Sequence, residues 1–260
     1  MTITLYEKKD RIAYITLNRP EVLNAENNQV KRELAEIFRD FQDDPDVWIG
    51  IVSGAGTRGF CAGSDIKEMA ELANSGGDPF ASVEPEPLQE GLMDVWKPLI
   101  AAIQGWCVGG GLELALVCDI RIATEDARFG LMEIRDGWPA SGGGTVRLPN
   151  QIHFAVAMEM ILTGETIDAR RAYEVGLINQ VVPSLEELMP AAERMAARIL
   201  ECAPLAVRYS KEQSLRSFSL PNYLGLPLRK LGAMEISNSA DAREGVKAFA
   251  EKRKPGWQGK

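Results

Sequence analysis

The stretch that most constrains the fold is residues 98–124, which read PLIAAIQGWCVGGGLELALVCDIRIAT. Two short apolar runs flank three glycines and a helix-length segment that shows little sign of a polar face. Apolar residues on all sides of an element indicate burial on all sides. The stretch therefore predicts a buried strand over 98–104, a helix over 112–118 and a second strand over 120–124, an order typical of an α/β core.

The rest of the chain predicts further strand–loop–helix units followed by helices. A hairpin is expected from the alternation in 3–8 and 11–17. Helices are predicted over 27–43, 65–73 and 88–97, and strands over 48–53 and 178–182. A Gly-, Pro- and Ser-rich surface loop is predicted over 74–87. From Ser184 onward almost every segment reads as helical. We expect an α/β core over residues 1–190 and an α-helical region over 191–260.

Composition and charge exclude several classes of protein. The 260 residues carry a formal net charge of −8, which argues against a nucleic-acid-binding surface. No apolar run reaches the roughly 20 residues that span a bilayer, and the N-terminus lacks the features of a secretory or transit signal. The four cysteines have no zinc-ligand spacing. A cytoplasmic protein without nucleic-acid or membrane partners, metal or separate cofactor is therefore expected.

The chain has a single histidine, His153, in the apolar run NQIHFAVAMEMILTG. Serine or cysteine nucleophiles that rely on a histidine base would have to use it. Its neighbours favour a packed or surface histidine on a helix instead. Acid–base chemistry in this chain is therefore expected from carboxylates.

Two glycine-containing turns lie where a predicted strand passes into a predicted helix. The first turn comprises residues 60–67. It fits two interpretations equally well: a tight turn in which Asp65 caps the helix, or a site for a developing negative charge. The second contains Gly109, Gly110 and Gly111, which allow close approach of the backbone to a ligand. Two such turns could direct one N–H group each at a single oxygen. Such an oxyanion hole is typically worth about 3–4 kcal/mol per donor.

Two glutamates lie in apolar segments near these turns. Glu113 follows the three glycines in the first turn of the predicted helix, and Glu133 belongs to the apolar, looped segment FGLME. A helix N-terminus alone would explain Glu113 as a surface residue, but its neighbours are apolar. Paired carboxylates in such surroundings are suited to general acid–base catalysis. We therefore interpret Glu113 and Glu133 as candidate catalytic residues.

Three other motifs have weaker functional interpretations. Residues 54–59, GAGTRG, match the GxGxxG pattern of dinucleotide sites, but the next helix is predicted only near residue 65. The loop GWPASGGGT does not match a nucleophile elbow around Ser141. The basic cluster Lys252–Lys254 reads as a solvated helix end more readily than as a phosphate site.

Taken together, the motifs resemble the crotonase, or enoyl-CoA hydratase/isomerase, superfamily, and most closely its enoyl-CoA hydratases. The matching segments cover nearly the whole chain and follow in order: LNRP, LNA, FCAGSDIKEM, KPLIAAIQGWCVGGGLELALVCDIRIA, ARFGLMEI, GGGTVRL, MEMILTGETIDARRAYEVGLINQVV and FAEKRK. The resemblance implies an α/β fold, a spiral of repeated ββα units. It also implies C-terminal helices that form trimers, often paired into hexamers.

The resemblance further implies an acyl-CoA thioester as substrate and the residues that contact it. Ser64 and Gly110 match the two donors of the oxyanion hole. The backbone around Ala25, Ala62 and Ile66 matches the adenine pocket. The full set of expected substrate contacts is Ala25, Ala62, Ser64, Asp65, Ile66, Lys67 and Gly110. The basic Lys252–Lys254 end could approach the CoA phosphates from a neighbouring subunit.

Both glutamate positions of true hydratases are filled in this chain, by Glu113 and Glu133. This implies reversible syn addition of water to a 2-enoyl-CoA, giving a 3-hydroxyacyl-CoA. Other activities of the family stay open: hydration of a cyclic dienoyl-CoA, dehydration of a specialised hydroxyacyl-CoA, double-bond isomerisation, or binding without catalysis. Two departures are visible. The loop with Trp138 is read as one residue longer than in typical hydratases, and Ser64 replaces a common alanine.

Overall fold

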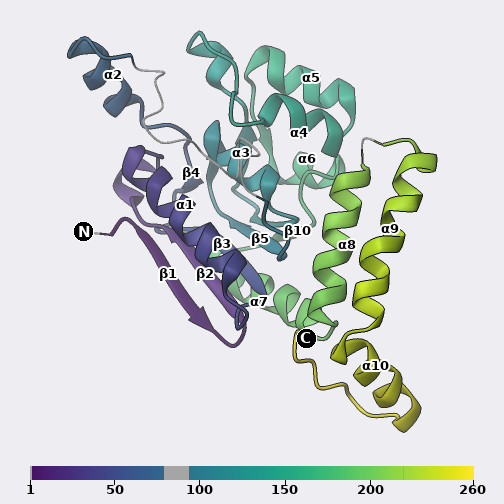
Figure 1. Ribbon diagram of the computed structural model, residues 1–260. Helices are drawn as coiled ribbons and strands as arrows, with labels where there is room; N and C mark the ends of the chain where they lie inside the picture. Colours follow the sequence, from purple (N-terminus) through teal and green to yellow (C-terminus); the bar gives the residue numbers. More distant parts are fainter. Residues whose placement is uncertain (1, 79–93, 219) are drawn as a thin grey trace.

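The strands form two sheets of different size (Figure 1). The computed structural model describes residues 2–78, 94–218 and 220–260. The larger sheet has six strands in the order β1-β2-β3-β5-β7-β10. Their bounds are Thr4–Lys9, Ile12–Leu17, Ile49–Gly54, Leu99–Ile103, Ile120–Thr124 and Gln180–Val182. β1 and β2 form the predicted hairpin and pair antiparallel, whereas the neighbours from β2 to β10 pair parallel.

The smaller sheet contains four short strands that the sequence pattern did not predict, in the order β4-β6-β8-β9. Their bounds are Gly59–Cys61, Trp106–Val108, Arg128–Gly130 and Ile167–Asp168. Each of β3, β5 and β7 in the larger sheet is followed in the chain by a strand of the smaller one. β4 then leads to α2 (Ile66–Asn74) and β6 to α3 (Gly110–Val117). These are the repeated ββα units that the resemblance implied.

Helices cover both faces of the larger sheet. α1 (Asn28–Asp43) packs on one face, and α7 (Leu185–Leu200) packs on the other. The remaining helices are η1 (Pro20–Val22), η2 (Glu133–Arg135), α4 (Gly144–Gln151), α5 (Phe154–Thr163), α6 (Ala169–Glu174), α8 (Pro204–Ser217), α9 (Asn222–Ser237) and α10 (Ala240–Glu251). α8 and α9 lie side by side at one edge of the molecule (Figure 1). The C-terminal part is therefore helical, as predicted.

The element bounds predicted from the pattern agree with the structure to different degrees. The helix predicted over 65–73 corresponds closely to α2. The helix predicted over 88–97 falls mainly outside the described residues, and its described part, 94–97, is not helical. The surface loop predicted over 74–87 also lies mostly outside them. The predicted boundary at residue 190 falls inside α7, and the division into two regions stays a prediction.

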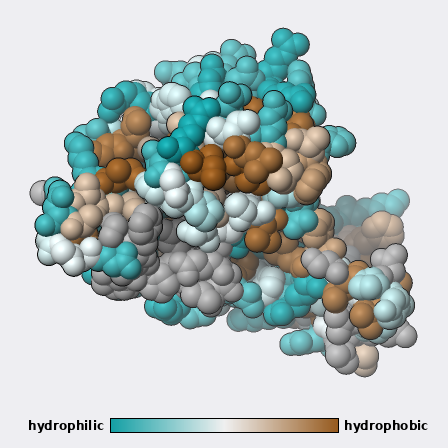
Figure 2. All heavy atoms as spheres, turned by 90° about the horizontal axis from the view of Figure 1, so that it is seen from above, coloured by the Kyte–Doolittle hydropathy of each residue, from teal (hydrophilic) through white to brown (hydrophobic). Residues whose placement is uncertain are grey.

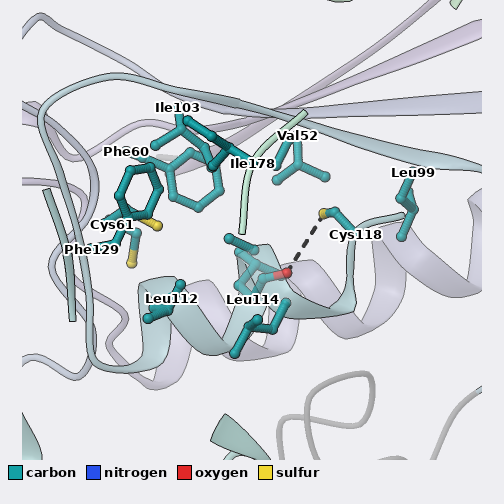
Figure 3. Packing of buried hydrophobic residues seen from close by; sticks show 14 of the residues in the cluster. Val52, Phe60, Cys61, Leu99, Ile103, Leu112, Leu114, Cys118, Phe129 and Ile178 are labelled. Atoms are coloured by element: carbon teal, nitrogen blue, oxygen red, sulfur yellow. Dashed lines mark hydrogen bonds between the residues drawn. The ribbon is translucent and has the colours of Figure 1, made fainter. Parts of the chain in front are cut away.

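α3 lies inside the main hydrophobic core (Figure 3). Its side chains Leu112 and Leu114 are fully buried in one cluster with Phe60, Ile103 and Phe129, which come from both sheets. Burying a leucine or phenylalanine side chain stabilises a fold by about 1.5–3 kcal/mol. Packing on both sheets therefore fixes α3, and with it the residues of its first turn.

Apolar side chains reach the surface in separate patches between hydrophilic ones (Figure 2). Three of the most exposed large apolar residues lie on the C-terminal helices: Phe249 is 88%, Tyr223 74% and Val246 73% exposed. Exposed groups of this size are typical of contact surfaces when they cluster. Within the described ranges, no helix is both long and apolar enough to cross a membrane.

Candidate active site

Glu113 is buried, and the structure shows how its charge is accommodated. The residue lies in the first turn of α3 and is 4% exposed. Its Oε1 accepts a hydrogen bond of 2.7 Å from the backbone N–H of Gly144, the first residue of α4. A helix N-terminus favours a carboxylate because its unpaired N–H groups and its dipole are positive. The start of α4 therefore compensates for the burial of Glu113.

Arg147, in the first turn of α4, adds a positive charge near Glu113. Its guanidinium donates a hydrogen bond of 3.1 Å to the carbonyl oxygen of Gly142. Burial lowers the pKa of Arg147, and attraction to the Glu113 carboxylate opposes that shift. The sequence pattern did not single out this arginine, because the loop before it was considered only for a nucleophile at Ser141. The signal that could have found it is a basic residue shortly after a glycine-rich helix start.

Gly109 lies next to both predicted catalytic glutamates, to Glu113 along the chain and to Glu133 in space. Its carbonyl oxygen accepts a hydrogen bond of 3.0 Å from the N–H of Glu113. A Cβ atom added to Gly109 would lie 3.3 Å from Oε1 of Glu133. Gly109 has a φ of 55°, which favours glycine. The structure therefore brings the carboxylate of Glu133, which comes from a different ββα unit, to the turn that directly precedes Glu113.

The two glycine turns predicted from the sequence are in contact with each other. Gly63 has a φ of +83°, and a Cβ atom there would lie 2.8 Å from the backbone nitrogen of Gly110 and 3.1 Å from the carbonyl oxygen of Val108. Only glycine fits this position without displacing backbone atoms. Because Ser64 follows Gly63, the N–H groups of Ser64 and Gly110 belong to neighbouring stretches of backbone.

The carboxylate of Asp65 binds groups of the protein itself. Its carboxylate accepts hydrogen bonds from the N–H groups of Lys67 and Glu68 and so caps α2. It also forms an ion pair of 2.8 Å with Arg19, and both side chains are largely buried. The helix-cap interpretation of Asp65 is therefore confirmed, and its contacts here are with protein groups.

The other predicted substrate contacts surround the start of α2. The carbonyl oxygen of Ala25 accepts a hydrogen bond of 2.6 Å from Nη1 of Arg19. The N–H of Ala62 donates one of 3.0 Å to the carbonyl oxygen of Leu23. Ile66 and Lys67 are exposed in the first turn of α2. Their side chains therefore face solvent at the N-terminal end of this helix.

The basic cluster Lys252–Lys254 lies far from α2 within one chain. Figure 1 shows α10 and α2 at opposite ends of the molecule. Arg253 forms ion pairs of 2.6 Å with Glu244 and with Glu251. Hydrogen bonding to Arg253 lowers the pKa of Glu244 to about 2. In a single chain the arginine of this cluster therefore stabilises the end of α10.

The structure also tests the interpretations of GAGTRG and of His153. Gly59, the last glycine of GAGTRG, begins strand β4 rather than a helix. The segment thus lacks the helix N-terminus on which a dinucleotide pyrophosphate would bind. Of the two alternatives for His153, packed or surface, the structure shows the surface one, and the residue precedes α5 rather than lying within it. Among the described residues, no group of His, Cys, Asp and Glu side chains could hold a metal ion.

Glu26 is a further buried carboxylate beside the two turns, and the sequence pattern did not single it out. The residue is 2% exposed, and a Cβ atom at Gly110 would lie 2.7 Å from its Oε2. Its N–H donates a hydrogen bond of 2.8 Å to the carbonyl oxygen of Gly63. The signal that could have found it is an acid directly after the matching segment LNA.

Comparison with known proteins adds to this geometry. The model of the enoyl-CoA hydratase/isomerase family matches residues 7–260. The chain is 39% identical over 267 residues to the (E)-benzylidenesuccinyl-CoA hydratase of Thauera aromatica, with 100% of both chains covered. It is 40% identical over 254 residues to the carnitinyl-CoA dehydratase of Proteus mirabilis, with 95% of this chain and 94% of that protein covered.

A solved structure shows the same architecture. The enoyl-CoA hydratase of Mycobacterium tuberculosis H37Rv matches the fold with a TM-score of 0.88 and 37% sequence identity, over 100% of both chains. The likeness thus extends over the whole chain in sequence and in structure, including the ββα units that form the two glycine turns. The chain belongs to the enoyl-CoA hydratase/isomerase, or crotonase, family.

Proposed function

We propose that the protein is an enoyl-CoA hydratase, which adds water reversibly to a 2-enoyl-CoA and gives a 3-hydroxyacyl-CoA. The observation that carries the proposal is that the carboxylate of Glu133 lies beside Gly109, the residue whose carbonyl oxygen accepts the first main-chain hydrogen bond of α3, from the N–H of Glu113. Both acids therefore adjoin the turn that contains Gly110. Two acids at one turn suit hydration, whereas an isomerase of this family would need only one.

In the proposed mechanism, the thioester oxygen accepts hydrogen bonds from the N–H groups of Ser64 and Gly110. The close contact between Gly63 and Gly110 supports this pairing, since it holds the two donors on neighbouring backbone segments. These donors make the β-carbon electrophilic and stabilise the enolate that forms when water attacks. Each is typically worth about 3–4 kcal/mol, because backbone donors need no reorganisation.

The two glutamates transfer the protons. Glu113 accepts a proton from water while the water oxygen bonds to the β-carbon, and the π electrons move onto the thioester as an enolate. Glu133, in its protonated form, delivers a proton to the α-carbon, and the enolate returns to the thioester. The substrate has then gained one water, and the proton passes from Glu113 back to Glu133 through solvent. The hydrogen bond from Gly144 supports this role, because it fixes the orientation of the base.

Replacing either acid with its amide tests the mechanism. Glu113→Gln and Glu133→Gln should each lower kcat for crotonyl-CoA hydration by about 10²–10⁴-fold, because an amide neither accepts nor delivers the proton. The loss of the conjugated thioester absorbance measures the rate. Glu36→Gln, on the exposed side of α1, is the matched control and should keep the rate of the parent protein.

Binding of the saturated analogue butyryl-CoA separates folding from chemistry. Both amide variants should bind it with nearly unchanged affinity, because the CoA contacts and the oxyanion-hole donors are intact. An unaltered hydration rate in Glu113→Gln would rule out the two-carboxylate mechanism. A protein that moves the double bond of an enoyl-CoA but adds no water would instead be an isomerase.

A second candidate is the dehydration of a specialised hydroxyacyl-CoA, because the similar protein of Proteus mirabilis is a carnitinyl-CoA dehydratase. Hydration and dehydration are one reaction in opposite directions, so the same residues serve both. The backbone N–H of Trp138 donates a hydrogen bond of 3.2 Å to the carbonyl oxygen of Glu133. The loop around Trp138 is thus a candidate determinant of the acyl group. A panel of short-chain, long-chain and cyclic substrates, assayed in both directions, distinguishes the candidates.

We also propose that the chain forms a homotrimer, or a hexamer of two trimers, through its C-terminal helices. The exposed apolar side chains of Tyr223 and Phe249 support a contact surface there. In such an assembly Lys252–Lys254 would approach the CoA phosphates of a neighbouring subunit. We expect a cytoplasmic enzyme with no nucleic-acid or membrane partner and no cofactor besides the CoA of its substrate.

A further inference from the structure

We propose that Glu26 is a positioning residue, which holds the two turns of the oxyanion hole at the spacing that enolate stabilisation needs. The inference rests on the proposed function, because it concerns the same enolate. Glu26 contacts both turns at once, the Ser64 turn through its main chain and the Gly110 turn through its side chain. The mechanism above gives this buried acid no proton to transfer.

The main chain of Glu26 sets the direction of the Ser64 N–H. The N–H of Glu26 donates a hydrogen bond of 2.8 Å to the carbonyl oxygen of Gly63, and its carbonyl oxygen accepts one of 3.0 Å from Asp65. The carbonyl group of Gly63 and the N–H of Ser64 belong to one planar trans peptide, in which they point in opposite directions. Since the carbonyl points at Glu26, the N–H of Ser64 points away from it.

The side chain of Glu26 reaches across to the second turn. A Cβ atom at Gly110 would lie 2.7 Å from Oε2 of Glu26 and 3.4 Å from Cα of Gly63. The carboxyl group therefore packs against the Cα of Gly110. Glu26 is 2% exposed, and close packing around a buried side chain resists its movement away from this contact. The side chain of Glu26 thus limits how closely and in which direction Gly110 approaches Gly63.

The charge of Glu26 distinguishes positioning from participation in the chemistry. A negative charge close to the enolate oxygen disfavours enolate formation, because like charges repel. Glutamine has the same shape without that charge. Glu26→Gln should therefore support the reaction at least as well as glutamate. Glu26→Ala removes the packing against Gly110 and should support it less well.

The test measures enolate stabilisation at equilibrium, with acetoacetyl-CoA as the probe. This β-ketoacyl thioester forms an enolate whose absorbance reports the enolised fraction when bound. We expect Glu26→Gln to bind an equal or larger enolised fraction than the parent protein. Glu26→Ala should lower the enolised fraction, and kcat for crotonyl-CoA, by about tenfold, while Kd for butyryl-CoA stays within about threefold.

Glu33→Ala is the matched control for a purely structural loss. Glu33 lies on α1, and its Oε2 accepts hydrogen bonds of 3.1 Å and 2.7 Å from the N–H groups of Ile3 and Thr4. Its removal should lower the thermal stability without lowering the enolised fraction. If Glu26→Ala does not fold, Glu26→Asp replaces it. Aspartate draws the carboxyl group back by one methylene and should give the same direction of loss.

The outcomes separate this inference from the proposed function. If the parent protein binds neither butyryl-CoA nor acetoacetyl-CoA, the proposed function is wrong and the inference is wrong with it. If it binds both and Glu26→Ala leaves the enolised fraction unchanged, only the positioning role is wrong. Equal losses in Glu26→Gln and Glu26→Ala would also overturn it, because the acid itself would then be needed.

Discussion

The two glycine turns beside the site share the order strand, glycine, helix, but one leads to an exposed helix and the other to a buried one. Each places a glycine of positive φ, Gly63 or Gly109, after a short strand of the smaller sheet and before a helix. α2 has no buried residue, and Asp65 caps it. α3 is buried from Gly110 to Leu116 and has no side-chain cap. One helix is thus held by polar contacts at its end, the other by the core around it.

This difference indicates how each turn responds to change. Cap and ion-pair contacts contribute individually small free energies, and α2 has no fully buried side chain besides them. In the close-packed core around α3, an added atom displaces the backbone on both sides of it. We therefore expect changes at the α3 turn to alter folding and rate. Changes at the α2 turn should alter stability modestly and binding most.

The largest effect on stability is expected for Gly111→Ala. A Cβ atom at Gly111 would lie 2.2 Å from the carbonyl oxygen of Cys61, inside the core. Overpacking costs about 1–3 kcal/mol, and a clash with backbone belongs at or above the upper end. Gly76→Ala, after α2, meets nothing within 4 Å at a φ of +83° and should cost about 1 kcal/mol. Urea unfolding measures both, and equal losses would contradict the comparison.

The next effect separates the two donors. Gly110→Ala places a Cβ atom 2.7 Å from Oε2 of Glu26 and should displace the donor, lowering kcat for crotonyl-CoA by about 10²-fold. Ser64→Ala keeps its backbone N–H and should change kcat by less than about threefold. Steady-state kinetics of hydration measure both. A larger loss in Ser64→Ala would show that the hydroxyl group, rather than the N–H, acts at this turn.

A smaller effect is expected at the cap of α2. Asp65→Ala removes two hydrogen bonds to the helix N-terminus and the ion pair with Arg19, and should lower the free energy of unfolding by about 1–2 kcal/mol. Asp65→Asn keeps a capping oxygen and should recover most of that loss. Thermal unfolding measures the series. If asparagine is as damaging as alanine, the ion pair with Arg19 matters more than the cap.

The smallest effect on folding is expected at the exposed start of α2. Ile66 is 51% exposed, so Ile66→Ala should change the free energy of unfolding by less than about 0.5 kcal/mol. If this face contacts CoA, the same change should raise Kd for CoA by about threefold, measured by calorimetry. Leu5→Ala, at a 41% exposed position on β1, is the control. Equal affinities of the two variants would place CoA elsewhere.

Elements with strong local patterns were predictable from the sequence. Individual strands of the larger sheet follow from apolar runs such as the one that forms β5, and the cap of α2 follows from Asp65 at a helix start. β4, β6 and β8 were not predicted, because each has three residues, too few to show the alternation of a strand. Their pairing depends on segments distant in the chain, which no local pattern reports.

The site divides in the same way. Glu113 was predictable because an acid in an apolar helix is anomalous on local grounds. Its partner, the N–H of Gly144, was not, because that hydrogen bond joins residues that are distant in the chain. Glu26 was not predictable for the same reason, since its proposed role rests on a contact with Gly110, which is distant in the chain.

By itself the sequence determined the order of the elements, the glycines at two helix starts and the two acids of the family motif. These are local properties, set by side-chain periodicity and by the backbone freedom of single residues. Only the tertiary structure decided which strands share a sheet, that Gly63 contacts Gly110, and that the carboxylate of Glu133 lies beside Gly109. These are contacts between distant segments, and the close packing of the whole core selects them.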